Sequence, residues 1–196
     1  QVPLASRVRV GVVSTDLQLT NVHGGVEIKT VSGDVEASDL ATRIEMTTIS
    51  GDIAVTGSKG LTVLHSVSGD IQANVDAESL DIGTISGDAA VQSDVAMSAV
   101  TLKSISGDMD INTQLGDAAR VRGSSVSGDI CLTINRDANV VIDLDTTAGG
   151  GIENGLTADV PKHGYGPGRQ LQFTLGAGKG SIDLTSVSGT LELAPR

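Results

Sequence analysis

The tripeptide Ser-Gly-Asp recurs along the chain at nearly constant spacing, and this repeat constrains the fold more than any other feature. Degenerate copies, Ser14-Thr15-Asp16 and Ser188-Gly189-Thr190, lie on either side of the series. Self-similarity with a period of about 20 residues is typical of repeat architectures in which each repeat is one structural unit. The six full copies are 18, 18, 18, 20 and 21 residues apart and begin at Ser32, Ser50, Ser68, Ser86, Ser106 and Ser127.

Apolar residues hold fixed positions around each anchoring serine. Counted from that serine, positions −6, −4, −1, +3 and +5 are apolar in 38 of 40 cases over eight rows, with Thr62 and Gly123 as the exceptions. Because 39% of the chain is apolar, chance alone would give only about 16 of 40. The pattern therefore predicts five columns of core-facing residues along the whole repeat.

Within each row, the pairs −6/−4 and +3/+5 alternate as half-buried strands do, whereas the alternation slips between −4 and −1 and predicts a bend there. The Gly-Asp pair predicts a second corner, since Gly allows positive φ and Asp can bond its own backbone. On this interpretation Ile49, Val67 and Ile85 in column −1 are buried. Ile85→Ala is then expected to lower the free energy of unfolding by about 2–5 kcal/mol through cavity formation. The hydroxyl columns at −2 and 0 are expected to point outward. Replacing Thr84 at −2 should therefore lower the free energy of unfolding far less.

These observations predict an all-β protein, a parallel β-solenoid of about eight to nine coils of about 18–22 residues in one domain over residues 1–196. Each row is expected to lie above the last, with parallel strands over residues 8–135 and eight rows making a rod of roughly 38 Å. A loop insertion is expected at about 153–169 and a C-terminal closing coil at 170–196, where Phe173 covers the end of the core. Since 18 divides equally into two nines or three sixes, flattened and triangular coils both stay open.

Charge and composition exclude several kinds of partner. The net charge of −11 disfavours phosphate backbones and anionic membrane surfaces. Aromatic residues make up only 1% of the chain, which argues against nucleic-acid modules that stack bases. The sequence contains no run of about 18 apolar residues, the length that a membrane-spanning helix requires. Gln1 to Leu4 lack the features of a signal peptide, and the single Cys131 permits no intrachain disulfide.

The aspartates of the repeat form the most unusual polar column. They are 7 of the 24 acidic residues, and without them the balance is 17 acidic to 13 basic residues, or −4. We interpret the column as structural, with each carboxylate accepting a backbone N–H at its own corner or in the next coil. The alternative is a calcium-binding edge, because carboxylate oxygens suit that ion, although the Gly-Gly-x-Gly-x-Asp pattern of calcium β-rolls is absent. The column comprises Asp16, Asp34, Asp52, Asp70, Asp88, Asp108 and Asp129.

Other binding motifs are weak. The segment 176–181, Gly-Ala-Gly-Lys-Gly-Ser, looks like a phosphate loop but lacks contiguous Gly-Lys-Ser/Thr, so we predict a turn. His23, His65 and His163 lack the paired spacing of a zinc site and are predicted to be surface residues. The hydroxyl ladder resembles that of ice-binding solenoids, but its second column is all Ser without methyl groups, so ordinary surface polarity is the better interpretation.

No catalytic constellation stands out either. Cys131 at position +4 should face outward, and no His falls in its row or the adjacent rows to act as its base, so we predict a passive thiol. Arg120 and Arg122 are the only clustered basic residues, whereas β-helix polysaccharide lyases combine acidic and basic residues in a cleft. The sequence therefore predicts a protein without enzyme activity and without a cofactor.

Four segments of the chain resemble the bacterial putative-adhesin domain family of unknown function. The resemblance covers nearly the whole chain and implies an envelope-associated β-solenoid, usually exported, with no assigned catalytic residues. Some relatives take part in envelope-stress responses. Family members commonly carry an export signal upstream, so whether this chain is a fragment stays open. The corners at Thr15, 149–151 and Thr190 depart from the pattern. The segments are Thr30-Val31-Ser32-Gly33-Asp34-Val35, Ser66-Val67-Ser68-Gly69-Asp70-Ile71, Tyr165-Gly166-Pro167-Gly168 and Ser186-Val187-Ser188-Gly189.

The leading hypothesis is a non-enzymatic structural or adhesive module of the bacterial cell envelope, periplasmic or extracellular. One alternative is a self-assembling filament subunit, because solenoid ends expose unpaired backbone that end-to-end stacking would satisfy. The other is a calcium-dependent binding module that uses the aspartate column from Asp34 to Asp129. The expected partner is an envelope component or another protein rather than a nucleic acid.

Overall fold

The computed structural model describes residues 6–163 and 166–196, and these residues form strands and turns without a helix. Consequently, nothing in these two ranges is a helix of the length and apolarity needed to cross a membrane. Residues Gln1 to Leu4 and Tyr165, which the sequence analysis considered, lie outside the described residues.

Sixteen strands make up the described chain. The first ten are β1 (Val8–Val12), β2 (Leu17–Thr20), β3 (Val26–Thr30), β4 (Val35–Ser38), β5 (Ile44–Thr48), β6 (Ile53–Ser66), β7 (Ile71–Thr84), β8 (Ala89–Lys103), β9 (Met109–Ser125) and β10 (Ile130–Ile134). The remaining six are β11 (Val140–Thr146), β12 (Ile152–Asn154), β13 (Lys162–His163), β14 (Arg169–Leu175), β15 (Gly180–Ser186) and β16 (Leu191–Pro195).

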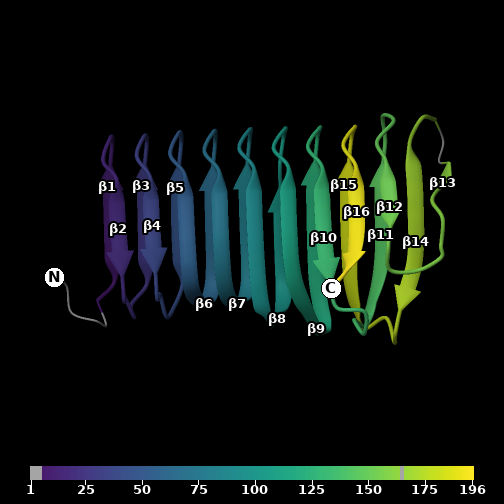
Figure 1. The fold of residues 1–196 in the computed structure, drawn as a ribbon, viewed down its shortest axis with the longest axis horizontal. Coiled ribbons are helices and arrows are strands. Elements are labelled where there is room, and N and C mark those ends of the chain that lie inside the picture. The colour runs from purple at the N-terminus through teal and green to yellow at the C-terminus, as the bar shows by residue number, and fades with distance from the viewer. Residues whose placement is uncertain (1–5, 164–165) are drawn as a thin grey trace.

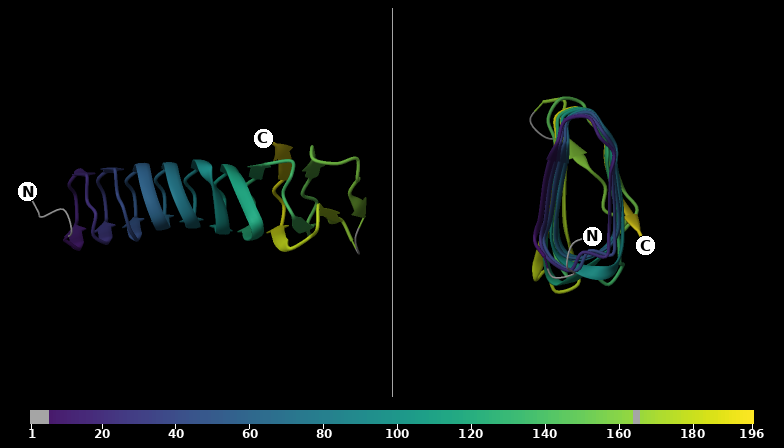
Figure 2. Two further views of the ribbon diagram at one scale, coloured as in Figure 1. Left: turned by 90° about the horizontal axis from the view of Figure 1, so that it is seen from below. Right: turned by 90° about the vertical axis from the view of Figure 1, so that its left-hand side faces the viewer.

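The strands form a parallel β-solenoid, which confirms the predicted fold class (Figure 1). Strand β3 pairs in parallel with β1 on one side and β5 on the other. Val26 lies opposite Ile44 and Ile28 opposite Met46, so residues 18 positions apart in the sequence become neighbours. Seen down the rod, the turns superimpose on one elongated loop with two long sides, so the coil is flattened (Figure 2).

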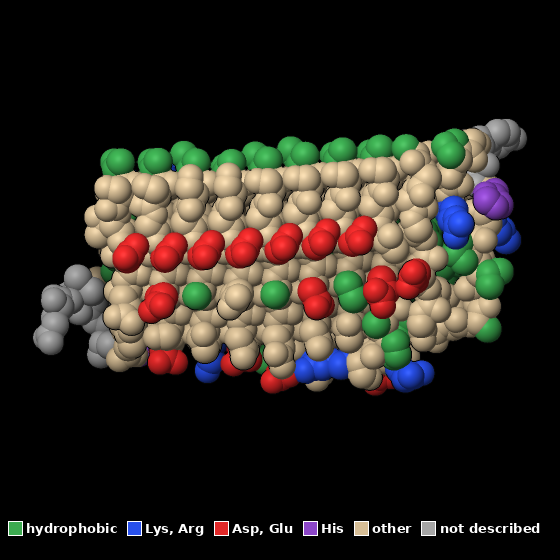
Figure 3. All heavy atoms as spheres, turned by 45° about the horizontal axis from the view of Figure 1, so that its top comes forward, with side chains coloured by type: hydrophobic (Ala, Val, Ile, Leu, Met, Phe, Trp, Pro, Cys, Tyr) green, Lys and Arg blue, Asp and Glu red, His purple; other side chains and the backbone are tan. Residues whose placement is uncertain are grey.

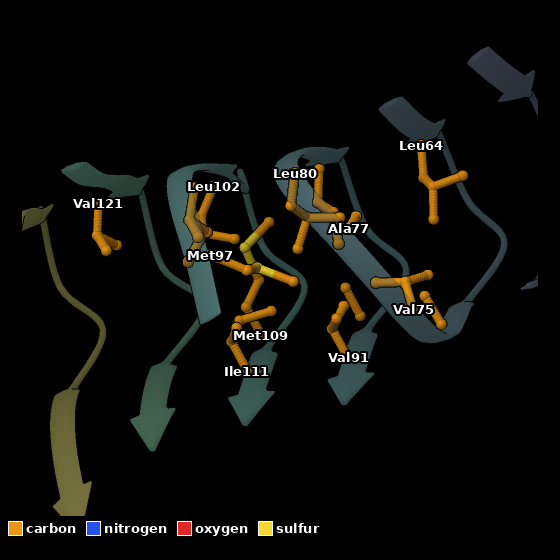
Figure 4. Close-up of a cluster of buried hydrophobic side chains, with 14 of the residues drawn as sticks. Leu64, Val75, Ala77, Leu80, Val91, Met97, Leu102, Met109, Ile111 and Val121 are labelled. Atoms are coloured by element: carbon orange, nitrogen blue, oxygen red, sulfur yellow. The ribbon is translucent and has the colours of Figure 1, made fainter. Parts of the chain in front are cut away.

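Columns −6, −4, +3 and +5 face the interior, as predicted. In the coil of Ser106 these positions hold Val100, Leu102, Met109 and Ile111, and all four side chains are buried. The two long sides of each coil meet in the middle, where Met97 fills the space beside Leu102 and Met109 (Figure 4). Because each coil stacks on the next, the columns join into one continuous core.

The prediction that column −1 is buried is wrong. Ile49 and Ile85 are 46% and 44% exposed, and Val67 is half-buried. The inward alternation continues without a bend from −6 through −4 to −2, so the hydroxyl residues Thr48 and Thr84 point inward instead. Residue polarity alone suggested the opposite arrangement, because burial of an apolar β-branched side chain was expected to be more favourable than burial of a hydroxyl.

The longer spacing of the later coils is absorbed at the corner opposite the Ser-Gly-Asp repeat. Strands β6 to β9 run through this corner, and their pairing shifts register only there. In the β8–β9 pair the shifts fall between Gln92 and Ala96 and between Met97 and Ala99. Inserted residues therefore enlarge one corner and leave the repeat corner aligned from coil to coil.

The last coil in the sequence is not the last in space. β15 pairs in parallel with β9 on one side and β11 on the other, and β16 pairs with β10 and β12. The β15/β16 coil thus lies between β9/β10 and β11/β12, whereas each row was expected to lie above the one before it. This placement explains one apolar exception, because a Cβ on Gly123 would lie 2.5 Å from Cδ2 of Leu184 on β15. The other, Thr62, is buried and shares a hydrogen bond of 3.1 Å with Ser58.

Antiparallel strands cover the C-terminal end of the solenoid. β14 pairs antiparallel with β11, which places Phe173 opposite Ile142, and β13 pairs antiparallel with β14. Phe173 is partly buried and packs against the core, at the end where the sequence placed it. At the other end, β1 pairs with β3 and β2 with β4, so in the described chain each presents one edge away from the rod.

Two isoleucines in one coil provide a matched test of this packing. Ile82 is completely buried, whereas Ile85 is 44% exposed. We expect Ile82→Ala to lower the free energy of unfolding by about 2–5 kcal/mol through cavity formation. We expect Ile85→Ala to cost less than about 1 kcal/mol, since it opens no cavity. Urea unfolding of both variants measures the difference, and equal losses would contradict the assigned orientation of column −1.

Candidate functional site

The repeated corners form a continuous edge along the rod, which we call the corner edge and define as positions −1 to +2 of the coils. Each regular coil presents three outward side chains there: Val or Ile at −1, Ser at 0 and Asp at +2. The apolar row and the aspartate row run parallel along the rod (Figure 3). The glycine at +1 lies between them and faces inward.

Buried hydroxyls at position −2 hold most of the corners in shape, and Thr30 is the exception, because its buried Oγ1 has no hydrogen-bond partner. The backbone N–H of Gly51 donates to Oγ1 of Thr48 at 2.9 Å, and that of Gly69 donates to Oγ of Ser66 at 2.8 Å. In the coil of Ser86 the hydroxyl of Thr84 also donates to the carbonyl of Gly87. A buried hydroxyl is inexpensive here because its hydrogen bonds are satisfied by the backbone of its own turn.

Glycine at +1 is required by the distance between coils. A Cβ on Gly69 would lie 2.0 Å from the carbonyl oxygen of Gly51, and one on Gly107 would lie 1.9 Å from that of Gly87. Within the +1 column only Gly33 has a positive φ, so the positive-φ explanation from the sequence does not hold generally. Thr15 is tolerated because, among the described residues, its coil has no coil before it.

The aspartates form a ladder of hydrogen bonds between coils. Oδ1 of Asp52 accepts the backbone N–H of Asp70 at 2.8 Å, and Oδ1 of Asp70 accepts that of Asp88 at 3.0 Å. The same bond recurs at every step from Asp16 to Asp129, over distances of 2.6 to 3.2 Å. The bonding pattern is the one that the structural interpretation of the column predicted.

Two of the irregular corners keep one of these contacts each, the ladder bond at Thr190 and the glycine contact at 149–151. The last aspartate, Asp129, accepts the N–H of Thr190, 61 residues later in the sequence. Thr190 has no carboxylate with which to continue the series. At 149–151, a Cβ on Gly150 would lie 2.4 Å from the carbonyl oxygen of Gly189, so the glycine contact extends into the β11/β12 layer.

Serine at position 0 adds a second bond to the same carbonyl of the preceding coil. Both the N–H and the hydroxyl of Ser86 donate to the carbonyl of Val67, at 3.0 and 3.1 Å. Ser106 bonds to Ile85 in the same way. Most polar side chains of the corner edge therefore bond to the backbone of a neighbouring coil.

An apolar ridge runs beside these ladders, which we define as the column −1 side chains. Most of them are exposed by 42% to 49%, and Val13 in the first coil by 70%. Each member contacts solvent on the outside of the corner while core positions lie on the opposite side of the strand. The ridge comprises Val13, Val31, Ile49, Val67, Ile85, Ile105, Val126 and Val187.

The thiol of Cys131 lies on the outer face of β10 and is half-buried. Burial raises its pKa, and the neighbouring carboxylates of Glu192 and Asp110 raise it further. A raised pKa keeps the thiol protonated at neutral pH, and the thiolate is the reactive form. This electrostatic setting agrees with the predicted passive thiol.

An ion pair joins the first two coils on the other long side. Nε of Arg9 donates to Oε2 of Glu27 at 2.8 Å, and this hydrogen bond is the main reason why the pKa of Glu27 is lowered. A lowered carboxyl pKa contributes stability above the ordinary Glu pKa, and this contribution is lost as the pH falls through the lowered value.

The remaining candidates from the sequence lie apart from one another. His23 and His163 are exposed, and Nε2 of His65 lies 3.5 Å from Oδ1 of Asp81. Residues 176–179 form the turn between β14 and β15, with left-handed φ at Gly176 and Gly178, whereas Gly180 and Ser181 of the predicted turn already belong to β15. Arg120 and Arg122 are exposed on β9. Within residues 6–163 and 166–196, no three His, Cys, Asp or Glu side chains are arranged to hold a metal ion.

The sequence interpretation missed two features of the site: the exposed ridge and the buried hydroxyls that hold the corners. A usable signal was present, because the strict period of 2 from −6 through −2 favoured an inward hydroxyl. The apolar character of column −1 outweighed that signal.

The contact between coils generates a prediction for glycine. We expect Gly69→Ala to lower the free energy of unfolding by at least about 2 kcal/mol, because the new methyl group overlaps the carbonyl of Gly51. Gly11→Ala is the matched control, since a Cβ there meets nothing within 4 Å. Thermal and urea unfolding of both variants provide the comparison, and a well-tolerated Gly69→Ala would contradict the proposed contact.

The aspartate ladder generates a second prediction. We expect Asp70→Ala to lower the free energy of unfolding by about 1 kcal/mol, because the N–H of Asp88 loses its acceptor. Asp70→Asn keeps an acceptor oxygen and removes one of a row of like charges, so its stability should equal or exceed that of the parent. Millimolar calcium should leave the melting temperature of the parent unchanged. A rise of several degrees that is lost in Asp70→Asn would favour the calcium edge instead.

Comparison with known proteins places the chain in a family. A search of solved structures found a putative cell adhesion protein from Clostridium sporogenes, with 12% identity and a TM-score of 0.40, over 71% of this chain and 56% of that one. No curated protein matched, and the comparisons indicate no enzyme family. The family model described as Toastrack DUF4097 matches residues 24–194. The chain therefore belongs to the toastrack family DUF4097, a bacterial putative-adhesin family of unknown function.

Proposed function

We propose that this protein is a non-enzymatic structural or adhesive module of the bacterial cell envelope, which acts by presenting a repeated linear surface. The observation that carries the proposal is the corner edge. Each coil offers the same outward Val/Ile, Ser and Asp side chains at the strand spacing of about 4.8 Å. Such a surface suits a partner that is itself extended or repetitive.

The construction of the corner edge supports a rigid display surface. The Asp side chains and most of the Ser side chains bond to the backbone of a neighbouring coil, so they hold fixed positions along the rod. Because these bonds use one carboxylate oxygen, Oδ1, the second oxygen of each aspartate remains for an outside partner. A preformed array of this kind loses little side-chain entropy on binding.

The two alternative functions receive less support. A filament subunit needs two open ends, whereas β14 and β13 cover the C-terminal end with antiparallel strands. A calcium-binding module needs about 6–8 oxygen ligands for each ion, whereas each rung contributes one carboxylate that already accepts a backbone N–H.

Cosedimentation with purified envelope material tests the proposal. We expect the protein to bind saturably to peptidoglycan sacculi from bacteria. Combined Asp70→Asn, Asp88→Asn and Asp108→Asn changes should weaken binding several-fold, because they remove charge and keep the acceptor oxygens of the ladder.

The matched control removes three charges away from the corner edge, by Glu78→Gln, Asp143→Asn and Asp183→Asn. This control should bind like the parent. Binding no stronger than that of an unrelated protein of equal charge would contradict the proposal. Equal weakening in the two triple variants would show a general charge effect and would contradict the role of the corner edge.

A further inference from the structure

Among the described residues, the apolar ridge is a large exposed feature that the fold itself does not need. Solenoid stability comes from the inward columns and the ladders between coils, and the ridge lies outside both. Single exposed apolar residues are ordinary, but a contiguous exposed line of them marks an interaction site. Here the line continues through every coil from Val13 to Val187.

A shallow groove lies beside the middle of the ridge. Its volume is about 360 Å³, and its wall on the ridge side is formed by Val67, Ile85 and Ile105. The other wall is column −3, where His65 and Lys103 lie on either side of Gly83. Gly83 has no side chain, and the imidazole of His65 lies over it, 3.1 Å from the position that a Cβ would take, so this part of the groove wall is low. A row of branched apolar side chains could lie in it.

The charges on the two sides of the ridge are opposite in sign. Column +2 on one side carries seven aspartates. Column −3 on the other side contains no acidic residue in the eight repeat rows and includes the exposed Lys29 and Lys103. Lys29 also lies 3.5 Å from Glu27, whereas Lys103 faces the groove.

We propose that the ridge binds the ridge of a second copy of this chain, so that two rods associate side by side and parallel. Each ridge lies in the groove between the ridge and column −3 of the other copy. Such a contact is isologous, as expected for a two-fold dimer. The proposal goes beyond the envelope role and does not depend on it.

The charge pattern favours a second copy of this chain as the partner and determines the relative direction of the two rods. A two-fold axis parallel to the rods turns the aspartate column of one copy toward column −3 of the other, which brings Asp and Lys side chains together. A two-fold axis perpendicular to the rods places both aspartate columns on the same side of the contact, where they repel each other. Electrostatic complementarity of this kind determines register and partner choice.

The available area suits only a weak dimer. Eight coils about 4.8 Å apart extend about 34 Å along the rod, and five residue steps from column −3 to column +2 measure at most about 16 Å along the chain. The chain bends at the corner, so the face measures at most about 540 Å² on each copy, or about 1,100 Å² in total, close to the roughly 1,000 Å² expected of a biological interface. We accordingly expect weak association, in the micromolar range.

Sedimentation velocity over 1–500 µM (roughly the range in which weak interfaces form) tests the association. The mass should rise from that of the 19.8 kDa monomer toward twice that value. The double change Ile85→Ser and Ile105→Ser should raise the dissociation constant at least about tenfold, a loss of about 1.4 kcal/mol. Lys103→Glu should weaken the dimer, because it places a like charge opposite the aspartate column of the other copy.

The control variant is Val95→Ser together with Val160→Ser, which removes exposed valines away from the ridge. It should dimerise like the parent, and circular dichroism with thermal melting should show that every variant is folded. A constant monomer mass up to 500 µM (far above the micromolar range expected for this area) would overturn the proposal. A dimer that survives the ridge double change would also overturn it.

Cross-linking tests the direction of the rods. In a Cys131→Ser background, Val31→Cys protein should form a disulfide with a second copy of itself, because parallel rods place like coils together. An antiparallel pair would instead link Val31→Cys protein to Val126→Cys protein, since these two positions each lie one coil in from opposite ends of the ridge. Linkage in the mixture without self-linkage of Val31→Cys would overturn the parallel arrangement.

Discussion

The structure depends on one close contact, in which the backbone of each corner glycine lies against the carbonyl of the corner glycine before it. No side chain larger than hydrogen fits between them, since a Cβ at this position would approach the carbonyl oxygen to about 2 Å. The contact aligns the coils at one corner, and the parallel ladders of the two long sides follow from that alignment. Variation in coil length is consequently confined to the opposite corner, where β6 to β9 contain their register shifts.

The same contact explains why a row of seven like charges is tolerated. Neighbouring carboxylates about 4.8 Å apart repel one another by about 1 kcal/mol in water. Each of them also accepts a backbone N–H that the closely packed corner would otherwise leave without a protein acceptor. A charge-assisted hydrogen bond of this kind contributes about 1.5–3 kcal/mol, which outweighs the repulsion. The column is therefore compatible with stability in the absence of an ion.

Much of this architecture could be predicted from the sequence, because an 18-residue period carries long-range information that local propensity lacks. The strand pairs, four of the five apolar columns and the structural role of the aspartates all follow from it. The orientation of Ile49 and Thr48 could not be read from polarity, since the hydroxyl is stabilised by the backbone of Gly51, a contact that exists only in the folded corner. The position of β15 could not be predicted either, because the repeat specifies which coils are alike but not the order in which they stack.

The position of β15 and β16 has a consequence for the order in which each molecule folds. A solenoid normally grows by adding the next coil to the last, so its early turns can assemble while the chain is still being synthesised. Here β11 and β12 cannot stack on β9 and β10 until residues 180–195, near the end of the described chain, have been made and inserted between them. The C-terminal third therefore completes in a single late step. Once complete, it also resists stepwise unzipping, because pulling on the C-terminus draws on an interior coil that is paired on both sides.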